Sequence, residues 1–392
     1  MRTSKIKSVG ILLAACALFT FTNAAEKIND YQQERTKSFN VNKGGKLYIN
    51  VNPGEIKITT WEKNEVVVKV RGLEDDEIDN VEMELKGNTV YVKYSPEWGW
   101  GDDAEFMITV PLQFNVEAKT SGGDVKLNSN ITGDVEISSM GGDVSASDIK
   151  GQARLSTQGG DVKVGNIFGS LNLNTMGGDI RVGDIKGDYA KVSTMGGDIN
   201  IGKVSSGIGA TTYGGDITII GIGGNADIET MGGNIDLKDI KGNVKLETKG
   251  GNLSVKNASG SIKATTYAGE IELFGITGSI DARTMSGNIT AEVNPSSGSS
   301  SKLFSQNGEV DLYLPSGAKA DIEAEIKTWG NWKYMKDTYS IESDFPAKES
   351  SSKREKGIEK FYSVNGGGAK IKITTTNGNI NINKGYYSTG EK

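Results

Sequence analysis

Apolar and polar residues alternate along most of this chain, and between residues 116 and 294 the alternation itself repeats. A Gly-Gly-Asp signature, or a relaxed form of it, marks each repeat. Its second glycine, called the mark glycine below, recurs at a spacing of 18 or 19 residues. The ten mark glycines are Gly123, Gly142, Gly160, Gly178, Gly197, Gly215, Gly233, Gly251, Gly269 and Gly287. A constant period of this length indicates a repeat architecture in which each unit packs against its neighbours.

Four columns of the repeat are apolar in every unit. They stand seven and five residues before the mark glycine, and two and four residues after it. One such column reads Val125, Val144, Val162, Ile180, Ile199, Ile217, Ile235, Leu253, Ile271 and Ile289. A spacing of two between apolar positions is the period of a β-strand with one buried face. Each unit is therefore predicted to hold two short strands, with threonine or serine three residues before the mark glycine.

Glycine is predicted to supply both turns of each unit. The first turn is the signature itself, and the second carries Gly151, Gly169, Gly187, Gly224, Gly242, Gly260 and Gly278. An isoleucine two residues before many of these glycines is expected to fill the bend, as at Ile149 and Ile167. Because glycine adopts positive φ without a steric penalty, we expect the turns to use it for that conformation.

Two architectures fit an 18-residue unit with two strands. In a parallel β-solenoid each unit is one coil and equivalent residues stack about 4.8 Å apart, whereas in an antiparallel meander they lie two strands apart. The constancy of the columns favours the solenoid, because equivalent side chains then touch. The prediction is therefore an all-β fold: a right-handed parallel β-solenoid (β-helix) of about ten 18-residue coils.

The repeat also divides the chain. Residues 1–25 are predicted to be a signal peptide, 26–115 an N-terminal β region and cap, and 116–294 the Gly-Gly-Asp solenoid. Residues 295–392 are predicted to form a C-terminal β region and cap, with a polar loop near 346–357. Caps are expected because the open end of a solenoid presents unpaired strand edges that recruit other chains.

Several segments resemble the bacterial "putative adhesin" family of β-strand-repeat proteins, a domain of unknown function. They are the Val110-Pro111 step before the first repeat, residues 308–315 (GEVDLYLP) and residues 366–378 (GGGAKIKITTTNG). The likeness extends over roughly residues 40 to 384. It implies an exported, β-helix-like fold and supplies no catalytic residues.

The N-terminal 25 residues have the features of a secretory signal. Arg2, Lys5 and Lys7 precede a 13-residue apolar stretch from Val9 to Phe21, and small residues follow. We expect export to the periplasm or cell surface, with no transmembrane span because the apolar stretch is too short. Cys16, the only cysteine, leaves an outer-membrane lipoprotein anchored at that residue as the alternative.

The composition of the chain excludes several kinds of catalytic and metal-binding site. The chain has 53 glycines, no histidine and a formal net charge of −6. Without histidine there is no Ser-His-Asp triad, Cys-His pair or histidine-bearing metal site, and an acidic exported chain is a poor nucleic-acid partner. No catalytic residue, metal or cofactor is predicted. A polysaccharide lyase or hydrolase based on carboxylates stays open, although such sites need loops that the constant spacing leaves no room for.

Three sets of residues were candidates for function. The aspartates after the mark glycines are interpreted as turn residues rather than cation ligands. The methionines and tyrosines two residues before the mark glycines are interpreted as exposed surface, with a strip that binds partners as the alternative. The candidate ligand-binding residues are tryptophans outside the repeats, which either cap the solenoid ends or bind sugar rings: Trp98, Trp100, Trp329 and Trp332.

The functional hypothesis is an exported, non-catalytic β-solenoid that acts as a structural or adhesin-like protein of the cell envelope. The partner would be a cell-surface glycan or protein. The alternative is a carbohydrate-binding or carbohydrate-active protein that uses the capping aromatics. A third hypothesis is end-to-end assembly through the solenoid edges.

Overall fold

The computed structural model describes residues 34–96, 104–327, 338–348, 353–354 and 357–387. Several predictions fall on residues outside these ranges. They are the signal peptide at 1–25 with Cys16, the four candidate tryptophans Trp98, Trp100, Trp329 and Trp332, and part of the polar loop near 346–357. Within the described ranges the chain is a β-solenoid, with one short helix, α1 (Asp75–Ile78).

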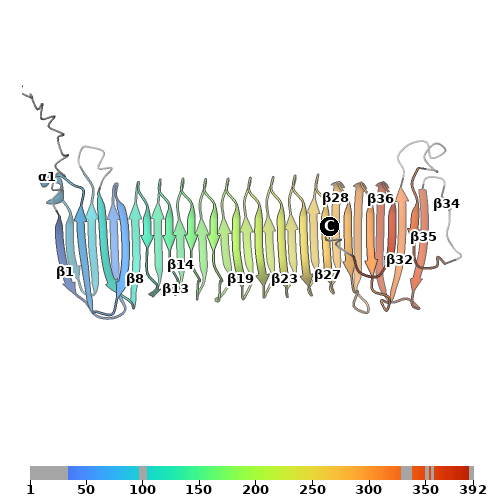
Figure 1. Cartoon of the computed structure of the whole chain (residues 1–392), viewed down its shortest axis with the longest axis horizontal. Coiled ribbons are helices and arrows are strands. Elements are labelled where there is room, and N and C mark those ends of the chain that lie inside the picture. Colours follow the sequence, from blue (N-terminus) through green and yellow to red (C-terminus); the bar gives the residue numbers. More distant parts are fainter. Residues whose placement is uncertain (1–33, 97–103, 328–337, 349–352, 355–356, 388–392) are drawn as a thin grey trace, which may run out of the picture. The chain divides into compact units, whose positions relative to one another are not determined.

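Each predicted repeat forms one coil, and each coil has two strands (Figure 1). The first strands are β8 (Phe114–Thr120), β11 (Val135–Ser139), β14 (Ala153–Ser156), β16 (Leu171–Asn174), β18 (Ala190–Ser193), β20 (Ile208–Thr211), β22 (Ala226–Glu229), β24 (Val244–Glu247), β26 (Ile262–Thr266) and β28 (Ile280–Ser286). The second strands are β9 (Val125–Leu127), β12 (Val144–Ala146), β15 (Val162–Val164), β17 (Ile180–Val182), β19 (Ile199–Val204), β21 (Ile217–Ile222), β23 (Ile235–Ile240), β25 (Leu253–Ala258), β27 (Ile271–Ile276) and β29 (Ile289–Val293).

Strands of successive coils pair in parallel, and equivalent residues are the pairing partners. Ile199 of β19 pairs with Ile217 of β21, which pairs with Ile235 of β23. The first strands form one sheet, called sheet B, and the second strands form another, called sheet A. In-register parallel pairing confirms the solenoid and excludes the meander for this region.

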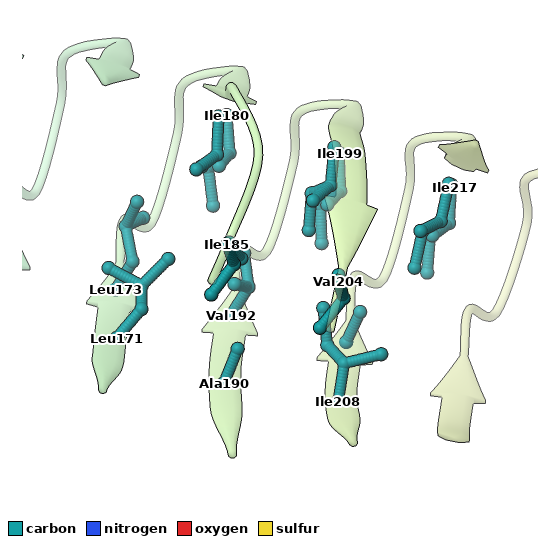
Figure 2. Packing of buried hydrophobic residues seen from close by; sticks show 14 of the residues in the cluster. Leu171, Leu173, Ile180, Ile185, Ala190, Val192, Ile199, Val204, Ile208 and Ile217 are labelled. Carbon is teal, nitrogen blue, oxygen red and sulfur yellow. The ribbon is translucent and has the colours of Figure 1, made fainter. Parts of the chain in front are cut away.

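The core lies between the two sheets. All four predicted apolar columns are buried, and Figure 2 shows Ile180, Ile199 and Ile217 pointing the same way from successive coils. The isoleucines near the second turn are buried too, as expected, and they make a third line of contact. Ile149 bridges Ile167, and Ile167 bridges Ile185; the short strands β10 (Ile131–Thr132) and β13 (Ile149–Lys150) begin this line. Each buried isoleucine stabilises the coil by roughly 1.5–3 kcal/mol.

The explanation expected for the turn glycines was wrong at most positions. Among the ten mark glycines only Gly123 and Gly287 have positive φ, and none of the seven second-turn glycines does. The glycines are needed because stacked turns approach closely. A Cβ built on Gly233 would lie 1.9 Å from the carbonyl oxygen of Gly215 in the preceding coil, and the other mark glycines from Gly142 onward meet similar obstacles.

Both ends of the solenoid add coils in an order that differs from the sequence. At the N-terminal end, β2 (Gly45–Val51) lies between β8 and the later strand β6 (Thr89–Tyr94). Likewise β3 (Glu55–Trp61) lies between β9 and β7 (Glu105–Pro111). The coil of β2 and β3 is thus inserted between the coil of β6 and β7 and the first repeat.

The C-terminal end repeats this arrangement. The coil of β36 (Ala369–Asn377) and β37 (Ile380–Lys384) lies in space between two coils that both precede it in the sequence. On one side it pairs with β30 (Ser300–Asn307) and β31 (Val310–Leu314). On the other it pairs with β32 (Ala320–Lys327) and β33 (Ile341–Ser343).

Antiparallel strands cover the terminal coils. At the N-terminal end β4 (Glu65–Arg71) pairs with β7 and with β1 (Arg35–Asn40), while β5 (Glu82–Lys86) pairs with β6. At the other end β35 (Gly357–Val364) pairs with β32 and with β34 (Lys353–Arg354). A strand that runs the opposite way interrupts the parallel template on which another coil would stack.

Candidate functional site

The threonine column holds each coil to the one before it. The Thr230 hydroxyl donates a 3.0 Å hydrogen bond to the Gly215 carbonyl of the preceding coil and accepts a 3.3 Å bond from the N–H of Gly233 in its own turn. Thr157, Thr175, Thr194, Thr212 and Thr248 make the same pair of bonds. These hydroxyls are buried, so the column stabilises the coil stack and is unavailable to a ligand.

The acidic column also joins neighbouring coils. The carboxylate of Asp198 accepts a 2.8 Å hydrogen bond from the backbone N–H of Asp216, one coil later. The bond recurs from Asp124 to Asp216, and it continues through Asn234 and Asn252. These side chains therefore stabilise the turn of the next coil. Asparagine accepts the same bond through its amide oxygen, which is why it can replace aspartate in this column.

Charge in this column is concentrated in its first half. Burial raises the pKa of Asp124, but hydrogen bonds from Lys126 and from the Asp143 N–H outweigh it, and the pKa lies below its ordinary value.

In the described ranges no three of Asp, Glu, Cys and His gather closely enough to hold a metal ion.

The methionines and tyrosines of the signature turn form an exposed row, called the Met/Tyr row below. Seven large apolar side chains belong to it, each between 38% and 55% exposed. They are Met140, Met176, Met195, Tyr213, Met231, Tyr267 and Met285. The carbonyl of Met195 accepts a 3.1 Å hydrogen bond from the N–H of Gly214 in the next coil, and that of Tyr213 accepts one from Gly232, so consecutive members are direct neighbours.

Folding does not require apolar side chains in this row. Gln158 and Lys249 occupy the same column and are exposed like their neighbours. The backbone bonds are made by Gln158 and Lys249 as well, which accept from Gly177 and Ala268. A row of half-exposed apolar side chains on one edge is therefore a candidate interaction surface.

A second aromatic group lies on the outer face of sheet A. The rings of Phe274 and Tyr387 stack with centroids 4.9 Å apart, and Tyr313 meets Tyr387 edge-on at 5.1 Å. The Tyr387 N–H donates to a carboxylate oxygen of Glu292 at 3.1 Å, which fixes the C-terminal segment across β29. The sequence analysis missed this cluster. Phe274 and Tyr313 share a column, five residues after Gly269 and Gly308, but Tyr387 lies outside the repeat register.

The solenoid surface carries open hollows. One of them, of about 670 Å³, is lined mainly by polar side chains such as Asn50, Lys93 and Ser121. Tyr94 also lines it; its buried hydroxyl has no hydrogen-bond partner, and burial, then the charge of Glu77, raises its pKa. A 540 Å³ hollow on sheet B presents opposite charges that neutralise one another, as in the 3.4 Å Lys245–Asp227 ion pair.

The candidate ligand-binding tryptophans Trp98, Trp100, Trp329 and Trp332 lie outside the described residues, so their role stays a prediction. Trp61 is described: its indole N–H donates a 2.7 Å hydrogen bond to the Glu65 carbonyl, and the Lys63 ammonium lies 4.6 Å from its ring centroid. Within the described ranges, no helix has the length and apolarity needed to cross a membrane.

The family of this chain is shown by comparison with family models. The model of a family described as Toastrack DUF4097 matches this chain twice, over residues 45–238 and 224–383. The chain belongs to the Toastrack family. This confirms the resemblance to adhesin-like domains of unknown function that was drawn from the sequence.

Solved structures similar to this Toastrack chain are remote in sequence. A "putative adhesin" from Bacteroides fragilis is 12% identical, with 90% of this chain and 97% of that chain covered and a TM-score of 0.24. A "putative adhesin" from Parabacteroides distasonis is 16% identical, with 72% and 94% covered and a TM-score of 0.27. A "putative lipid binding protein" from the same species is 14% identical, with 72% and 93% covered and a TM-score of 0.25. No curated protein matches the chain.

Proposed function

We propose that this Toastrack chain is an exported, non-catalytic module of the cell envelope with a structural or adhesive role, and that it makes contact through the Met/Tyr row. Export is supported by the basic, apolar and small-residue order of residues 1–25. An adhesive role is supported by family membership and by the placement of the row along one edge.

The exposed row is the observation that carries the proposal. Seven half-exposed methionine and tyrosine side chains share one column, and four of them, Met176, Met195, Tyr213 and Met231, follow one another without a break and leave an apolar strip in water. Single exposed apolar residues are ordinary on protein surfaces, but contiguous ones mark contact sites. Methionine is flexible and polarisable and tyrosine combines an apolar ring with a hydroxyl, so both suit a contact surface.

A non-catalytic role is supported by how the acidic column is used. Its side chains accept hydrogen bonds from the next coil's turn, as Asp143 does from Asp161. General acid–base catalysis by two carboxylates needs a cleft where their pKa values are pushed apart. In the described residues, the aspartates of this column are exposed or half-exposed along a solvated edge.

Fractionation of the cells that make the chain tests this proposal. We expect the wild-type chain in the periplasmic or surface fraction, retained on the envelope after washing. A Met176→Ser/Met231→Ser variant should reach the same compartment but wash off. Ile220→Ser, which changes a 50% exposed residue away from the row, should behave as wild type. A cytoplasmic wild-type chain, or equal retention of the row variant, would contradict the proposal.

Glycan binding is a second candidate, favoured by the exposed aromatics on the described part of the chain. Tyr386 is 70% exposed and Tyr387 37% exposed beside Phe274. Aromatic faces of this kind bind the apolar faces of sugars. A glycan array tests it: binding should be lost on Trp98→Ala, Trp332→Ala or Tyr386→Ala, and an array without any signal would remove this candidate.

A further inference from the structure

The longest unbroken apolar part of the Met/Tyr row extends over four coils. Met176, Met195, Tyr213 and Met231 occupy successive turns and are between 38% and 51% exposed. They are called the apolar strip below. Because equivalent residues of stacked coils are about 4.8 Å apart, the strip is roughly 14 Å long and follows the direction in which the coils stack.

The turns that carry the apolar strip are negatively charged. Read from four residues before the mark glycine to one residue after it, these four turns contain four carboxylates and neither lysine nor arginine. The carboxylates belong to Asp179, Asp198, Asp216 and Glu229. Asp179 forms an ion pair with Arg181 at 3.0 Å, whereas the other three have no ion pair among the described residues. Three carboxylates beside the strip are therefore available to a cation from outside the chain.

Coil stacking does not require the negative charge of these aspartates. Asp198 Oδ1 accepts a hydrogen bond from the N–H of Asp216 at 2.8 Å, and Asp216 Oδ1 accepts one from the N–H of Asn234 at 2.7 Å. The uncharged Asn234 side chain accepts the same bond from the N–H of Asn252 at 2.8 Å. Among the described residues, the second carboxylate oxygens of Asp198 and Asp216 have no hydrogen-bond partner. These oxygens and their charge are therefore available to a partner.

In these four turns no side chain stands between the apolar strip and the residue after the mark glycine. Two glycines separate them in each turn, and the first is exposed, as at Gly196 and Gly214. A side chain would be tolerated at Gly232, where a Cβ would lie 3.5 Å from the Gly214 carbonyl oxygen, an ordinary contact. Ala268 occupies the same position in a later coil. The bare backbone lets one partner contact the apolar and the acidic side chains together.

We propose that the apolar strip binds a cationic amphipathic helix of a partner protein. The helix lies along the strip, with its apolar face on the methionines and Tyr213 and its lysines or arginines over the aspartates. The inference rests on the proposed contact role of the Met/Tyr row and names the chemistry of its partner. Charge complementarity selects a cation, because Asp198 and Asp216 have no cationic partner in the described ranges. An anionic membrane surface would instead oppose like charges, which destabilises a contact.

The spacing of the coils favours a helix over an extended strand. One helical turn rises about 5.4 Å, close to the ~4.8 Å between coils, whereas alternate residues of a strand are about 6.7 Å apart. Over the three intervals of the apolar strip, a helix departs from the coil spacing by about 2 Å and a strand by about 6 Å. The part of the helix that contacts the strip is therefore expected to be about ten residues long.

Fluorescence anisotropy with a labelled peptide tests whether the strip binds such a helix. The peptide has about 14 residues, with leucine at the helical spacing i, i+3, i+4, i+7 and lysine elsewhere. We expect the chain, purified from the cells that make it, to bind this peptide with a dissociation constant on the order of 10 µM. Met195→Ser/Tyr213→Ser should weaken binding at least about tenfold, with unchanged far-UV circular dichroism as evidence of folding.

The matched control for the strip is Ile220→Ser, which changes a 50% exposed residue away from the row and should bind as wild type does. A wild-type chain that binds no peptide at about 1 mM would overturn the proposal. Equal loss of binding in Ile220→Ser and in the strip variant would overturn it as well.

Paired substitutions of aspartate by asparagine test the charge. Asp198→Asn/Asp216→Asn keeps an acceptor for the next coil and should weaken peptide binding about three- to tenfold. Asp134→Asn/Asp188→Asn makes the same change of charge after glycines of the second turn. It should leave binding unchanged at about 0.15 M salt, where charges more than ~8 Å away are screened. Equal binding by the two asparagine variants would refute a cationic partner at these aspartates.

Two further probes distinguish the class of partner. A peptide of leucine and lysine in strict alternation has the pattern of an amphipathic strand, and binding as tight as that of the helical peptide would refute the helix. Vesicles of phosphatidylglycerol should not bind; vesicle binding that Met195→Ser/Tyr213→Ser abolishes would assign the row to a membrane surface instead. If no peptide binds and Met176→Ser/Met231→Ser still washes off cells, this partner is wrong and the proposed function stands without it.

Discussion

The closest approach between coils occurs at the mark glycines, and a single methyl group there should disturb the stack. In Gly233→Ala the new Cβ would lie 1.9 Å from the Gly215 carbonyl oxygen and 2.4 Å from its carbon. Because Cβ contacts below 3.0 Å are essentially never observed, the two turns must separate by at least about 1.1 Å, the difference between 3.0 Å and 1.9 Å. Both obstructing atoms are backbone, so no side-chain rotation relieves the clash.

That separation breaks the hydrogen bonds that join the two coils at this turn. The Thr230 hydroxyl donates to the Gly215 carbonyl at 3.0 Å, the Gly232 N–H donates to the Tyr213 carbonyl at 3.1 Å, and the Asn234 N–H donates to the Asp216 carboxylate at 2.7 Å. At about 1 kcal/mol for each bond, Gly233→Ala should destabilise the folded chain by roughly 3 kcal/mol.

The neighbouring glycine is the matched control. A Cβ on Gly232 would lie 3.5 Å from the Gly214 carbonyl oxygen, an ordinary contact, and Gly232 does not have positive φ. Ala268 and Ser286 already occupy this position in later coils. Gly232→Ala should therefore leave stability unchanged or raise it by about 0.4–1 kcal/mol through the lower entropy of the unfolded chain.

Urea unfolding followed by far-UV circular dichroism measures the difference. Tryptophan fluorescence would report on the ends, because all five tryptophans lie outside residues 116–294. Equal midpoints for the two alanine variants would refute close coil approach as the reason for the mark glycines. Loss of stability in Gly232→Ala alone would refute it as well.

Three further substitutions test other parts of the argument. Thr230→Val removes the partner of the buried Gly233 N–H and of the partly buried Gly215 carbonyl, and it should lower the unfolding free energy by about 2–4 kcal/mol in the same urea assay, whereas Thr230→Ser should retain most of it. Ile199→Asp places an unpaired charge in the centre of the core and should abolish the cooperative thermal transition; an unchanged melting curve would contradict the solenoid core. Hydrogen bonds from Lys119 and then Lys46 lower the pKa of Glu117, so its stabilisation is present above the ordinary pKa of 4.5 and is lost as pH falls through the lower folded value. Stability of Glu117→Gln should accordingly fall less than wild type between about pH 5 and pH 3, and parallel pH profiles would refute this assignment.

Much of the coil could be predicted because its signals are local and repeated. The apolar column that contains Ile199 and Ile217 predicted buried strands that pair in register. A single short apolar run could belong to a strand or a helix, but ten repetitions of it indicate strands. The exposed position of the Met/Tyr row could be predicted because the polar residues Gln158 and Lys249 occupy the same column, which a buried column would not accept. These properties depend on the period of two and on stacking between consecutive repeats, which a linear sequence displays directly.

The cause of the glycine turns could not be predicted from composition. Glycine can be required by positive φ or by a close neighbour, and the sequence is the same in both cases. The distance between Gly215 and Gly233 distinguishes them, and it exists only when two coils are stacked. The hydrogen bond that the Asp198 carboxylate accepts from the Asp216 N–H could not be predicted for the same reason, because its partners are 18 residues apart.

The sequence by itself determined the repeating coil, its buried columns and its exposed row, because each depends on residues within one or two periods. The tertiary structure alone decided how the solenoid ends. The coil of β2 and β3 lies inside the later β6 and β7, and β36 and β37 lie inside the earlier β32 and β33. The bond from Thr120 to Gly54, 66 residues away, continues the threonine column through this exchange. Such order depends on which strand edges remain free once the whole chain has folded, and no local pattern encodes that.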